Sequence, residues 1–535
     1  MGIPIKKQGW KHLMLYLIFG LMSFVLMMYY LSNTLIHFTS SQQFPINSFK
    51  RFPLTFLIFP AELFSFCFAM YFVYNLFTDR YRNEKPEELL NKSSIRVAVL
   101  IPVYNEPREI VERTIAACKK LIWPGGVRIY LLDDSSSEED MASMKILSKY
   151  YGCMLVRRSD RTGFKAGNIN NAIKNAVREE YFVVFDSDQA PEPKFLEEVM
   201  DYFSNISVGF VQTPQHFINV TTPLERAAKI GTDIFYNSQC VSKAHDGALP
   251  FCGTNAVIRT SAFLSVNGFS YFSSTEDIEL GLRLNSVGYF GIYVPKILVY
   301  GYAPPDFVAY SSQQYRWANG NLAILREHWK KILFGKFNLR QQIHTVFTLG
   351  WWVIGIVTLI YVIVPILSLL LGGTHHTWLP TTLLLLLFLN VVTGISMIYF
   401  SQHARNDNDK IRISDAFLQY SLITNSMFIY IKAAINVLLG RYVGFIRTNK
   451  KRTQSGWWKI KWNLLLSAIC FGFSTFALYH AAISSDMQQI RTYLPVSIWL
   501  LFYSVMLASS IIFVGYDLPK KNEKPRLGTK GVSIG

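Results

Sequence analysis

Carboxylate and amide side chains follow three short apolar runs in the first half of the chain. The runs read "RVAVLIPV", "VRIYLLDD" and "YFVVFDSD", and the polar residues at or just after their ends are Asn105, Glu106, Asp133, Asp134, Asp186 and Asp188. A single strand followed by such residues is ordinary, because Asp and Asn are common turn formers. Three of them in one parallel sheet predict a single polar edge, because ligands bind beyond the carboxyl ends of such strands.

The pair Asp186 and Asp188 has the composition of a metal site. Only the small residue Ser187 separates the two carboxylates, so both can face one ion. Mg²⁺ and Mn²⁺ take carboxylate oxygens and complete their shells with phosphate oxygens and water. A nucleotide diphosphate held by such an ion suits this edge, and the ion would stabilise the departing diphosphate. The alternative is that the aspartates only end a buried strand.

Two later motifs allow both a structural and a chemical interpretation. In "SSTEDIELGLRLNSVGY", Ser274 and Asp277 have the spacing of a capping box for a helix over 275–286, although a carboxylate at a helix start can also act as a general base. In "SSQQYRWANGNLAIL", Tyr315 and Trp317 could anchor the chain at a membrane surface, with Arg316 among the inward-facing positive charges. Arg316 could instead pair with a diphosphate, and Trp317 could offer a flat face to a sugar ring.

The elements that would position these residues alternate between strands and helices from 94 to 336. Apolar runs of strand length are separated by segments of helical period, for example a helix with Ile110, Thr114, Ala117 and Leu121 on one face. This alternation predicts an α/β domain with a mostly parallel sheet and helices on both faces.

The rest of the chain has the composition of a membrane protein. Half of the 535 residues are hydrophobic, only 17% are charged, and the mean hydropathy is +0.21. Runs of about 20 apolar residues can cross the hydrocarbon core. Six spans are predicted, at 12–31, 53–74, 344–371, 378–400, 462–483 and 493–516. A seventh apolar segment, 414–439, contains charged and amide side chains and is expected to lie in the membrane interface.

The basic residues predict the orientation. With six spans, most lysine and arginine clusters fall on one side, which is then cytoplasmic and carries both termini and the α/β domain. The net charge of +17 is mostly explained by this topology, and a nucleic-acid partner is not expected because no basic segment is interleaved with stacking aromatic residues. The first apolar run is too long for a signal peptide, so we expect it to be retained in the plasma (inner) membrane.

Eight motifs in order resemble those of a known enzyme family. "YNEP", "LDDSS", "FKAGNINNA", "FDSDQAP", "VQTPQ", "FCGTN", "STED" and "QQYRW" resemble the processive, membrane-embedded family 2 glycosyltransferases, most closely cellulose synthases. The resemblance covers the whole α/β region and continues into the spans. It implies a GT-A fold inserted into a helical transmembrane channel.

The resemblance also implies roles for individual residues. For the sugar-nucleotide donor it implies uridine contacts from Asn105, Glu106, Asp133 and Asp134, diphosphate contacts from Lys165 and Arg316, and a Mg²⁺ or Mn²⁺ site at Asp186 and Asp188, where Asp186 also supports UDP. For the acceptor sugar it implies Asp277 as the general base, with Phe251, Cys252, Glu276, Gln313 and Trp317 as contacts. His216 lies near the metal motif in the family's order, but a surface histidine is the favoured interpretation.

Two features depart from the family pattern. The loop that covers UDP in the family corresponds to "FIRTNKK", which keeps Phe445, Thr448 and Lys450 but has Arg447 in place of a valine. Thr448 and Lys450 are therefore expected to contact the donor from a mobile lid. About twenty residues follow the last predicted span, so we expect no cyclic-di-GMP-binding barrel after it.

The expected layout follows from the spans and motifs together. We expect two membrane helices within 1–80, the GT-A domain at 94–336, an interface helix and two spans at 337–402, an interface helix and the lid loop at 403–456, two spans at 457–518, and a cytoplasmic tail at 519–535.

The implied function is processive synthesis of a β-glucan from UDP-glucose, β-1,4-linked or mixed β-1,3/1,4-linked, with export of the chain. The expected partners are UDP-glucose, the growing polysaccharide and membrane lipid. Two alternatives stay open at this point. One is a non-processive transferase or one for another sugar, such as N-acetylglucosamine or mannose. The other is a non-catalytic export channel.

Overall fold

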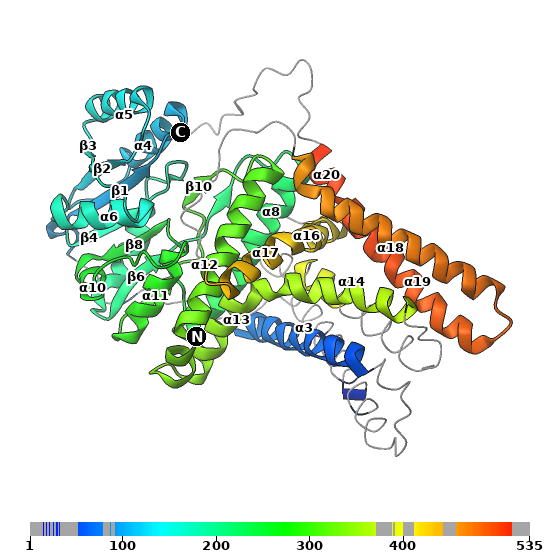
Figure 1. The fold of residues 1–535 in the computed structure, drawn as a ribbon. Coiled ribbons are helices and arrows are strands. Elements are labelled where there is room, and N and C mark those ends of the chain that lie inside the picture. Colours follow the sequence, from blue (N-terminus) through cyan, green and yellow to red (C-terminus); the bar gives the residue numbers. More distant parts are fainter. Residues whose placement is uncertain are drawn as a thin grey trace.

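The computed structural model describes residues 52–78, 91–370, 391–399, 411–441 and 456–515, with isolated positions 14, 18, 21, 25, 28, 29, 32, 86 and 388. An α/β body lies on one side of Figure 1, and the long helices α14 (Ile354–Leu370), α18 (Trp457–Ile483) and α19 (Met487–Ala508) extend away on the other. The division into domains expected from the sequence stays a prediction.

A seven-stranded sheet forms the centre of the α/β body, in the order β3-β2-β1-β4-β8-β6-β9. Its strands are β1 (Val97–Val103), β2 (Val127–Asp133), β3 (Met154–Val156), β4 (Tyr181–Val184), β6 (Val208–Gln212), β8 (Ala256–Arg259) and β9 (Phe290–Tyr293). The pairs β1–β2, β1–β4, β2–β3 and β6–β9 are parallel, while β8 is antiparallel to both β4 and β6. The predicted, mostly parallel sheet is confirmed.

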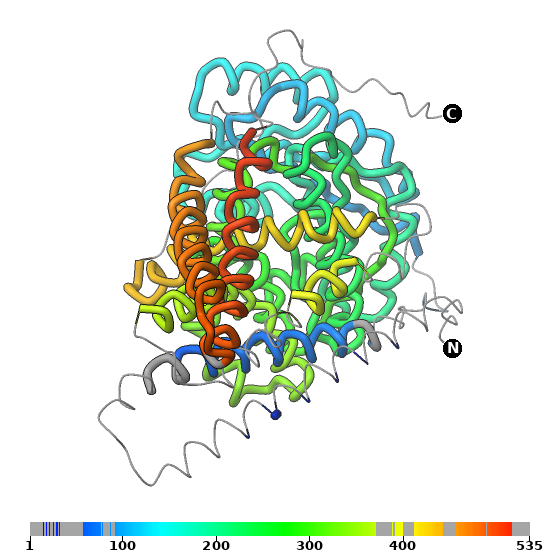
Figure 2. Tube along the Cα trace, turned by 90° about the vertical axis from the view of Figure 1, so that its right-hand side faces the viewer, coloured from blue at the N-terminus to red at the C-terminus, as the bar shows by residue number. Residues whose placement is uncertain are grey.

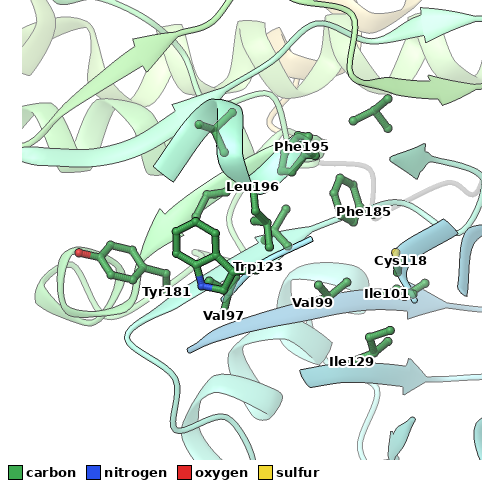
Figure 3. Close-up of a cluster of buried hydrophobic side chains, with 14 of the residues drawn as sticks. Val97, Val99, Ile101, Cys118, Trp123, Ile129, Tyr181, Phe185, Phe195 and Leu196 are labelled. Atoms are coloured by element: carbon green, nitrogen blue, oxygen red, sulfur yellow. The ribbon is translucent and has the colours of Figure 1, made fainter. Parts of the chain in front are cut away.

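Both faces of this sheet are covered. In β1, Val97, Val99 and Ile101 pack into one hydrophobic cluster, and Ala98 and Leu100 pack into another on the opposite face, as the alternation of side chains along a strand requires. Figure 3 shows the first cluster. It is closed by α4 (Arg108–Cys118), α5 (Glu138–Tyr151) and α7 (Phe195–Val199), whereas α6 (Phe164–Asn175), α10 (Thr260–Ser265) and α11 (Glu276–Ser286) close the second.

A small three-stranded sheet and several further helices complete the body. The small sheet has the order β5-β10-β7, formed by β5 (Ala190–Pro191), β10 (Val299–Gly301) and β7 (His216–Phe217). Next to it lie α8 (Pro223–Ile234), a single π-helical segment η3 (Phe235–Cys240), α9 (Val241–His245) and the 28-residue helix α12 (Phe307–Phe334).

Among the described residues, five helical segments are long and apolar enough to cross a membrane. Four of them coincide with predicted spans: Leu57–Asn75, Leu339–Leu370, Trp457–Ile483 and Gln489–Gly515. They lie in α3 (Phe52–Thr78), in α13 (Leu339–Gly350) with α14, in α18, and in α19 with α20 (Ser510–Gly515). The helices α18 and α19 run side by side in both views (Figures 1 and 2), and the pairs Ser467–Ser504 and Ser474–Ser497 hydrogen-bond between them, a common form of contact between membrane helices.

The fifth segment, Ile413–Leu438, covers the stretch expected to lie in the interface. It is divided into α16 (Ile413–Asn425) and α17 (Met427–Leu438), with Ser426 between them. Its length and composition allow it to cross, and the interface placement stays a prediction. The predicted spans 12–31 and 378–400 lie largely outside the described residues.

Candidate active site

A cavity of about 720 Å³ begins at the carboxyl edge of the main sheet and continues between the long helices. At the sheet edge it is lined by Tyr104, Glu106, Asp134, Lys165, Asp186, Asp188, Glu276 and Asp277. Between the helices it is lined by an aromatic wall, which consists of Phe64, Phe68, Tyr71, Phe347, Trp351, Trp352, Tyr361, Tyr420, Tyr430 and Tyr503. The polar edge and the long helices therefore enclose one continuous space.

The ends of β1 and β2 are tied together by Asn105. Its backbone has φ of 50°, a left-handed conformation that asparagine tolerates better than most residues. The Ser136 amide donates to Asn105 Oδ1 at 2.8 Å, and Asn105 Nδ2 donates to the Ser136 hydroxyl at 2.9 Å. Asn105 does not line the cavity, whereas the neighbouring, buried Glu106 does.

Two arginines hold the aspartates at the end of β2. Arg158 binds Asp134 through both carboxylate oxygens, at 3.0 and 2.7 Å, a two-point geometry that fixes orientation. Asp133 accepts a hydrogen bond from the Ser135 amide at 2.9 Å and lies 3.6 Å from Arg157. Sequence reasoning did not assign these arginines to the site. Their position just after β3, which pairs in parallel with β2, is the signal that could have placed them at this edge.

Lys165, near the start of α6, connects the end of β4 to the following loop. Its ammonium donates to Asp186 Oδ1 at 2.5 Å and to the Gly253 carbonyl at 2.8 Å. The second aspartate, Asp188, is buried, and its Oδ2 accepts from the Tyr302 amide at 3.4 Å. Lys165 and both aspartates line the cavity.

The donor set at Asp186 and Asp188 fits a hard divalent cation. No group of three or more His, Cys, Asp or Glu side chains with metal-site geometry occurs in the described part of the chain. Two carboxylates are nevertheless enough for Mg²⁺ or Mn²⁺ when phosphate oxygens and water complete the shell. His216 lies in β7, where its ring contacts Tyr300 edge-on at 5.8 Å between centroids.

Asp277 lies in the first turn of α11, half-buried against the loop after Phe251. The predicted capping box is wrong: the N-cap is Thr275, without a side-chain cap, and the Ser274 hydroxyl donates instead to the Arg316 carbonyl at 3.0 Å. Burial raises the pKa of Asp277, against the opposing effect of Arg316. Burial, followed by the charge of Asp277, raises the pKa of Glu276 to about 7.

The long helix α12 is fixed against the start of α11. Gly320 lies so close to Thr275 that a Cβ atom there would overlap the threonine hydroxyl. Arg316 Nη1 also donates to the Ser274 carbonyl at 3.4 Å. Arg316 and Trp317 both line the cavity beside Asp277.

The "FCGT" loop forms the remaining wall. Cys252 lines the cavity, and Gly253, at φ of +78°, leaves space for the carboxylate of Asp277, because a Cβ atom there would lie 2.6 Å from Asp277 Oδ2. Phe251 is fully buried between Phe210 and Phe269, with centroid distances of 5.7 and 6.1 Å, and does not line the cavity. Its position does not support a direct contact with the acceptor.

The structure thus brings most of the predicted site residues around one space. Those that line it are Glu106, Asp134, Lys165, Asp186, Asp188, Cys252, Glu276, Asp277, Gln313, Arg316 and Trp317. Asn105, Asp133 and Phe251 support it from behind, and Thr448 and Lys450 lie outside the described residues. The roles assigned to all of them stay predictions.

The comparison with known families agrees with the motifs. Residues 181–396 match the family described as "Glycosyl transferase family group 2". This match agrees with the resemblance of the motifs to family 2 glycosyltransferases, and the predicted α/β fold with helices long and apolar enough to cross a membrane is confirmed for the described residues.

Curated relatives are named as polysaccharide synthases. The chain is 30% identical over 294 residues to a "Cellulose synthase catalytic subunit [UDP-forming]" from Xanthomonas axonopodis pv. citri, which covers 54% of this chain and 40% of the relative. It is 30% identical over 260 residues to a "Probable glucomannan 4-beta-mannosyltransferase 15" from Arabidopsis thaliana, covering 46% and 48%. "Cellulose synthase 1" from Komagataeibacter xylinus is 25% identical over 450 residues, covering 81% and 28%. The chain spans less than half the length of each of these relatives.

Proposed function

We propose that the protein is a processive, inverting glycosyltransferase that polymerises glucose from UDP-glucose into a β-glucan and moves the chain across the plasma membrane. The observation that carries this proposal is the single cavity that joins Asp277, Lys165 and the Asp186–Asp188 pair to the aromatic wall. A polymer that grows at the sheet edge has a route between the helices, and aromatic side chains can stack on its sugar rings. Nucleotide sugars are then used on the cytoplasmic side.

The chemistry proposed for the site is a single displacement. The hydroxyl at the acceptor end loses its proton to Asp277 as it attacks the anomeric carbon of the donor. Asp277 is ionised above its raised pKa and is directed by its hydrogen bond from the Ile278 amide, 2.9 Å long. Glu276, with a pKa of about 7, retains a proton in part of the population at neutral pH and can then donate a hydrogen bond to an oxygen of the acceptor sugar.

Positive charge at the opposite wall stabilises the leaving group. The ammonium of Lys165 and the guanidinium of Arg316 both border the cavity and would pair with the diphosphate as negative charge develops on it. Asp186 and Asp188 would hold Mg²⁺ or Mn²⁺, which supplies charge neutralisation for the departing UDP when bound. No covalent intermediate on the protein is required.

A second candidate is mannosyl transfer from a nucleotide-mannose donor. The similarity to the glucomannan mannosyltransferase supports it as directly as the other relatives support glucose. The site residues discussed above serve either sugar, because they address the diphosphate and the acceptor hydroxyl.

The test is an assay of the purified protein in lipid nanodiscs. UDP-glucose, GDP-mannose and UDP-N-acetylglucosamine are supplied separately with Mg²⁺ or Mn²⁺, and any polymer is digested with linkage-specific endoglucanases and mannanases. Polymer from UDP-glucose that a β-1,4-glucanase degrades supports the proposal. Polymer formed only from GDP-mannose or only from UDP-N-acetylglucosamine overturns the choice of sugar, and oligosaccharides extended by one unit overturn processivity.

A further inference from the structure

The π-helical segment η3 and the helix α9 contain a buried charge that the mechanism above does not use. Lys243 in α9 has no solvent exposure at all. Its ammonium donates to Gln239 Oε1 at 3.1 Å and lies 4.9 Å from the centroid of the Phe235 ring. No carboxylate of the described residues lies within ion-pair distance of it. Burying an ammonium group without a carboxylate partner costs folding free energy, so the presence of Lys243 at this position needs an explanation.

Both groups that hold this ammonium face the cavity. Gln239 and Phe235 line it, together with Cys252 of the "FCGT" loop, whereas Lys243 does not reach it. Burial lowers the pKa of Lys243 to about 8, so the side chain is still mostly protonated at neutral pH. The lysine therefore acts on the cavity only through its neighbours.

The contact with Lys243 fixes the orientation of the Gln239 amide. An ammonium group only donates hydrogen bonds, so the atom it contacts must be the amide oxygen. The nitrogen Nε2 is left with two N–H donors, and the structure records no hydrogen bond from it to any of the described residues. A π-helical turn is a frequent feature of functional sites, and this one places position 239 on the cavity side.

We propose that Gln239 donates a hydrogen bond to an oxygen of the acceptor sugar, and that Lys243 is a positioning residue that keeps the amide nitrogen pointed into the cavity. The inference rests on the proposed function, and it names the class of ligand as a neutral β-linked oligosaccharide with an acceptor oxygen beside Cys252. Because the amide can only donate from this orientation, the site favours a hydroxyl or ring oxygen and disfavours an ammonium group, as in a deacetylated amino sugar.

Direct binding tests this without turnover. The binding of cellohexaose and of mannohexaose to the protein in nanodiscs is measured by calorimetry in the absence of donor. We expect Gln239→Glu to weaken binding of the preferred hexaose about tenfold, the value of one lost hydrogen bond of this kind. The same change should leave the fold intact, since a carboxylate at 239 gains an ion pair with Lys243. Gln342→Glu, at a glutamine of α13 outside the cavity, serves as the matched control and should bind like wild type.

Lys243→Met tests the positioning role. We expect it to raise the KM for the oligosaccharide acceptor severalfold and to leave the KM for the sugar nucleotide unchanged, and Lys229→Met on α8 is its control. Wild-type-like acceptor binding by both Gln239→Glu and Gln239→Leu overturns the inference even if Lys243→Met does not fold. Wild-type protein that binds neither hexaose counts against the proposed function itself, and the inference is overturned with it.

Discussion

Lys165 Nζ lies 2.5 Å from Asp186 Oδ1 and 2.8 Å from the carbonyl of Gly253. This one side chain therefore connects Asp186, the first aspartate of the proposed metal site, with the loop that borders Asp277, the proposed base. The two halves of the proposed reaction, release of the diphosphate and activation of the acceptor, share this lysine. The side chain of Asp186 remains about one-third exposed, so a cation can approach it from the cavity.

Loss of this ammonium should affect the donor first. We expect Lys165→Met to weaken UDP binding by about tenfold or more, since a charge-assisted contact to phosphate is among the stronger hydrogen bonds. UDP affinity is measured by calorimetry with Mg²⁺ present. Lys174→Met, near the end of the same helix and outside the cavity, should bind UDP as wild type does. Equal affinities for wild type and Lys165→Met would remove the lysine from the donor site.

Removal of the proposed base should strongly reduce turnover and leave donor binding unchanged. Asp277→Asn keeps the size of the side chain, and we expect turnover to fall by about 10²-fold or more, as for other general bases. Incorporation of radiolabelled sugar measures the rate, and UDP affinity monitors the intact site. Glu139→Gln, on the exposed surface of α5, is the control. Activity within a few-fold of wild type would assign the proton to another group.

The pH dependence of activity should follow from the carboxyl group of Asp277 at the start of α11. Burial raises the pKa of Asp277, and the reaction needs its ionised form, so activity is present above that pKa and is lost as the pH falls through it. We expect the acid limb of kcat/KM to lie above the ordinary aspartate range of about 4. A limb at or below that range contradicts the assignment of a desolvated base.

The neighbouring Glu276 should give a separate stability signal. Its folded pKa of about 7 lies above its ordinary value, so its contribution to stability is present at low pH and is lost as the pH rises through 7. Glu276→Gln should therefore be as stable as wild type near pH 4 and more stable at pH 8, as measured by the thermal unfolding midpoint. If the difference in unfolding midpoint between wild type and Glu276→Gln is the same at pH 4 and at pH 8, the raised pKa of Glu276 is contradicted.

Gly253 offers a steric test with an internal control. Gly253→Ala introduces a Cβ atom 2.6 Å from Asp277 Oδ2 at a positive φ, whereas Gly126→Ala meets nothing within 4 Å at a similar φ of +88°. Both variants should lose about 1 kcal/mol from backbone strain. Only Gly253→Ala should also lose activity, because it displaces the base. If the two alanine variants turn over equally well, the contact between the loop and Asp277 has no catalytic importance.

The need of turnover for a divalent cation, and the part of Asp188 in binding it, can be tested together. We expect chelation by EDTA to stop turnover, and added Mg²⁺ or Mn²⁺ to restore it. Asp188→Asn should raise the Mg²⁺ concentration needed for half-maximal activity by about tenfold, since an amide is a weaker ligand for a hard cation than a carboxylate is. Asp201→Asn, a buried aspartate paired with Lys92 outside the cavity, is the control. Full activity in EDTA would exclude an essential divalent ion.

The parts of this site that the sequence predicted are those with a local pattern. An apolar run that ends in aspartates is visible within eight residues, and parallel neighbours then bring the ends of β1, β2 and β4 together. No local sequence pattern predicts that β8 lies between β4 and β6. Its two antiparallel partners are about 45 to 75 residues away in the sequence, so the pairing depends on the whole fold.

The sequence-based predictions failed where a side chain contacts a partner that no motif indicates. Ser274 was predicted to cap its own helix, but α12 places the Arg316 carbonyl within 3.0 Å, and that acceptor takes the hydroxyl. Phe251 was expected beside the acceptor because of its motif, whereas the rings of Phe210 and Phe269 bury it in the core. The amide of Gln239 was missed since its partner, Lys243, is one helical turn away and carries no motif.

The close fit between Gly320 and Thr275 restrains movement of α12 relative to the start of α11. A shift of α12 along its own axis would bring neighbouring side chains against the threonine, so we expect Arg316 and Trp317 to keep their positions relative to Asp277. Under the proposed function, a movement that advances the polymer by one sugar would then come from other parts of the molecule, and the spacing between Asp277 and Arg316 would stay the same from one cycle to the next. A processive transferase, as proposed, would then form every new bond with the same arrangement of Asp277 and Arg316.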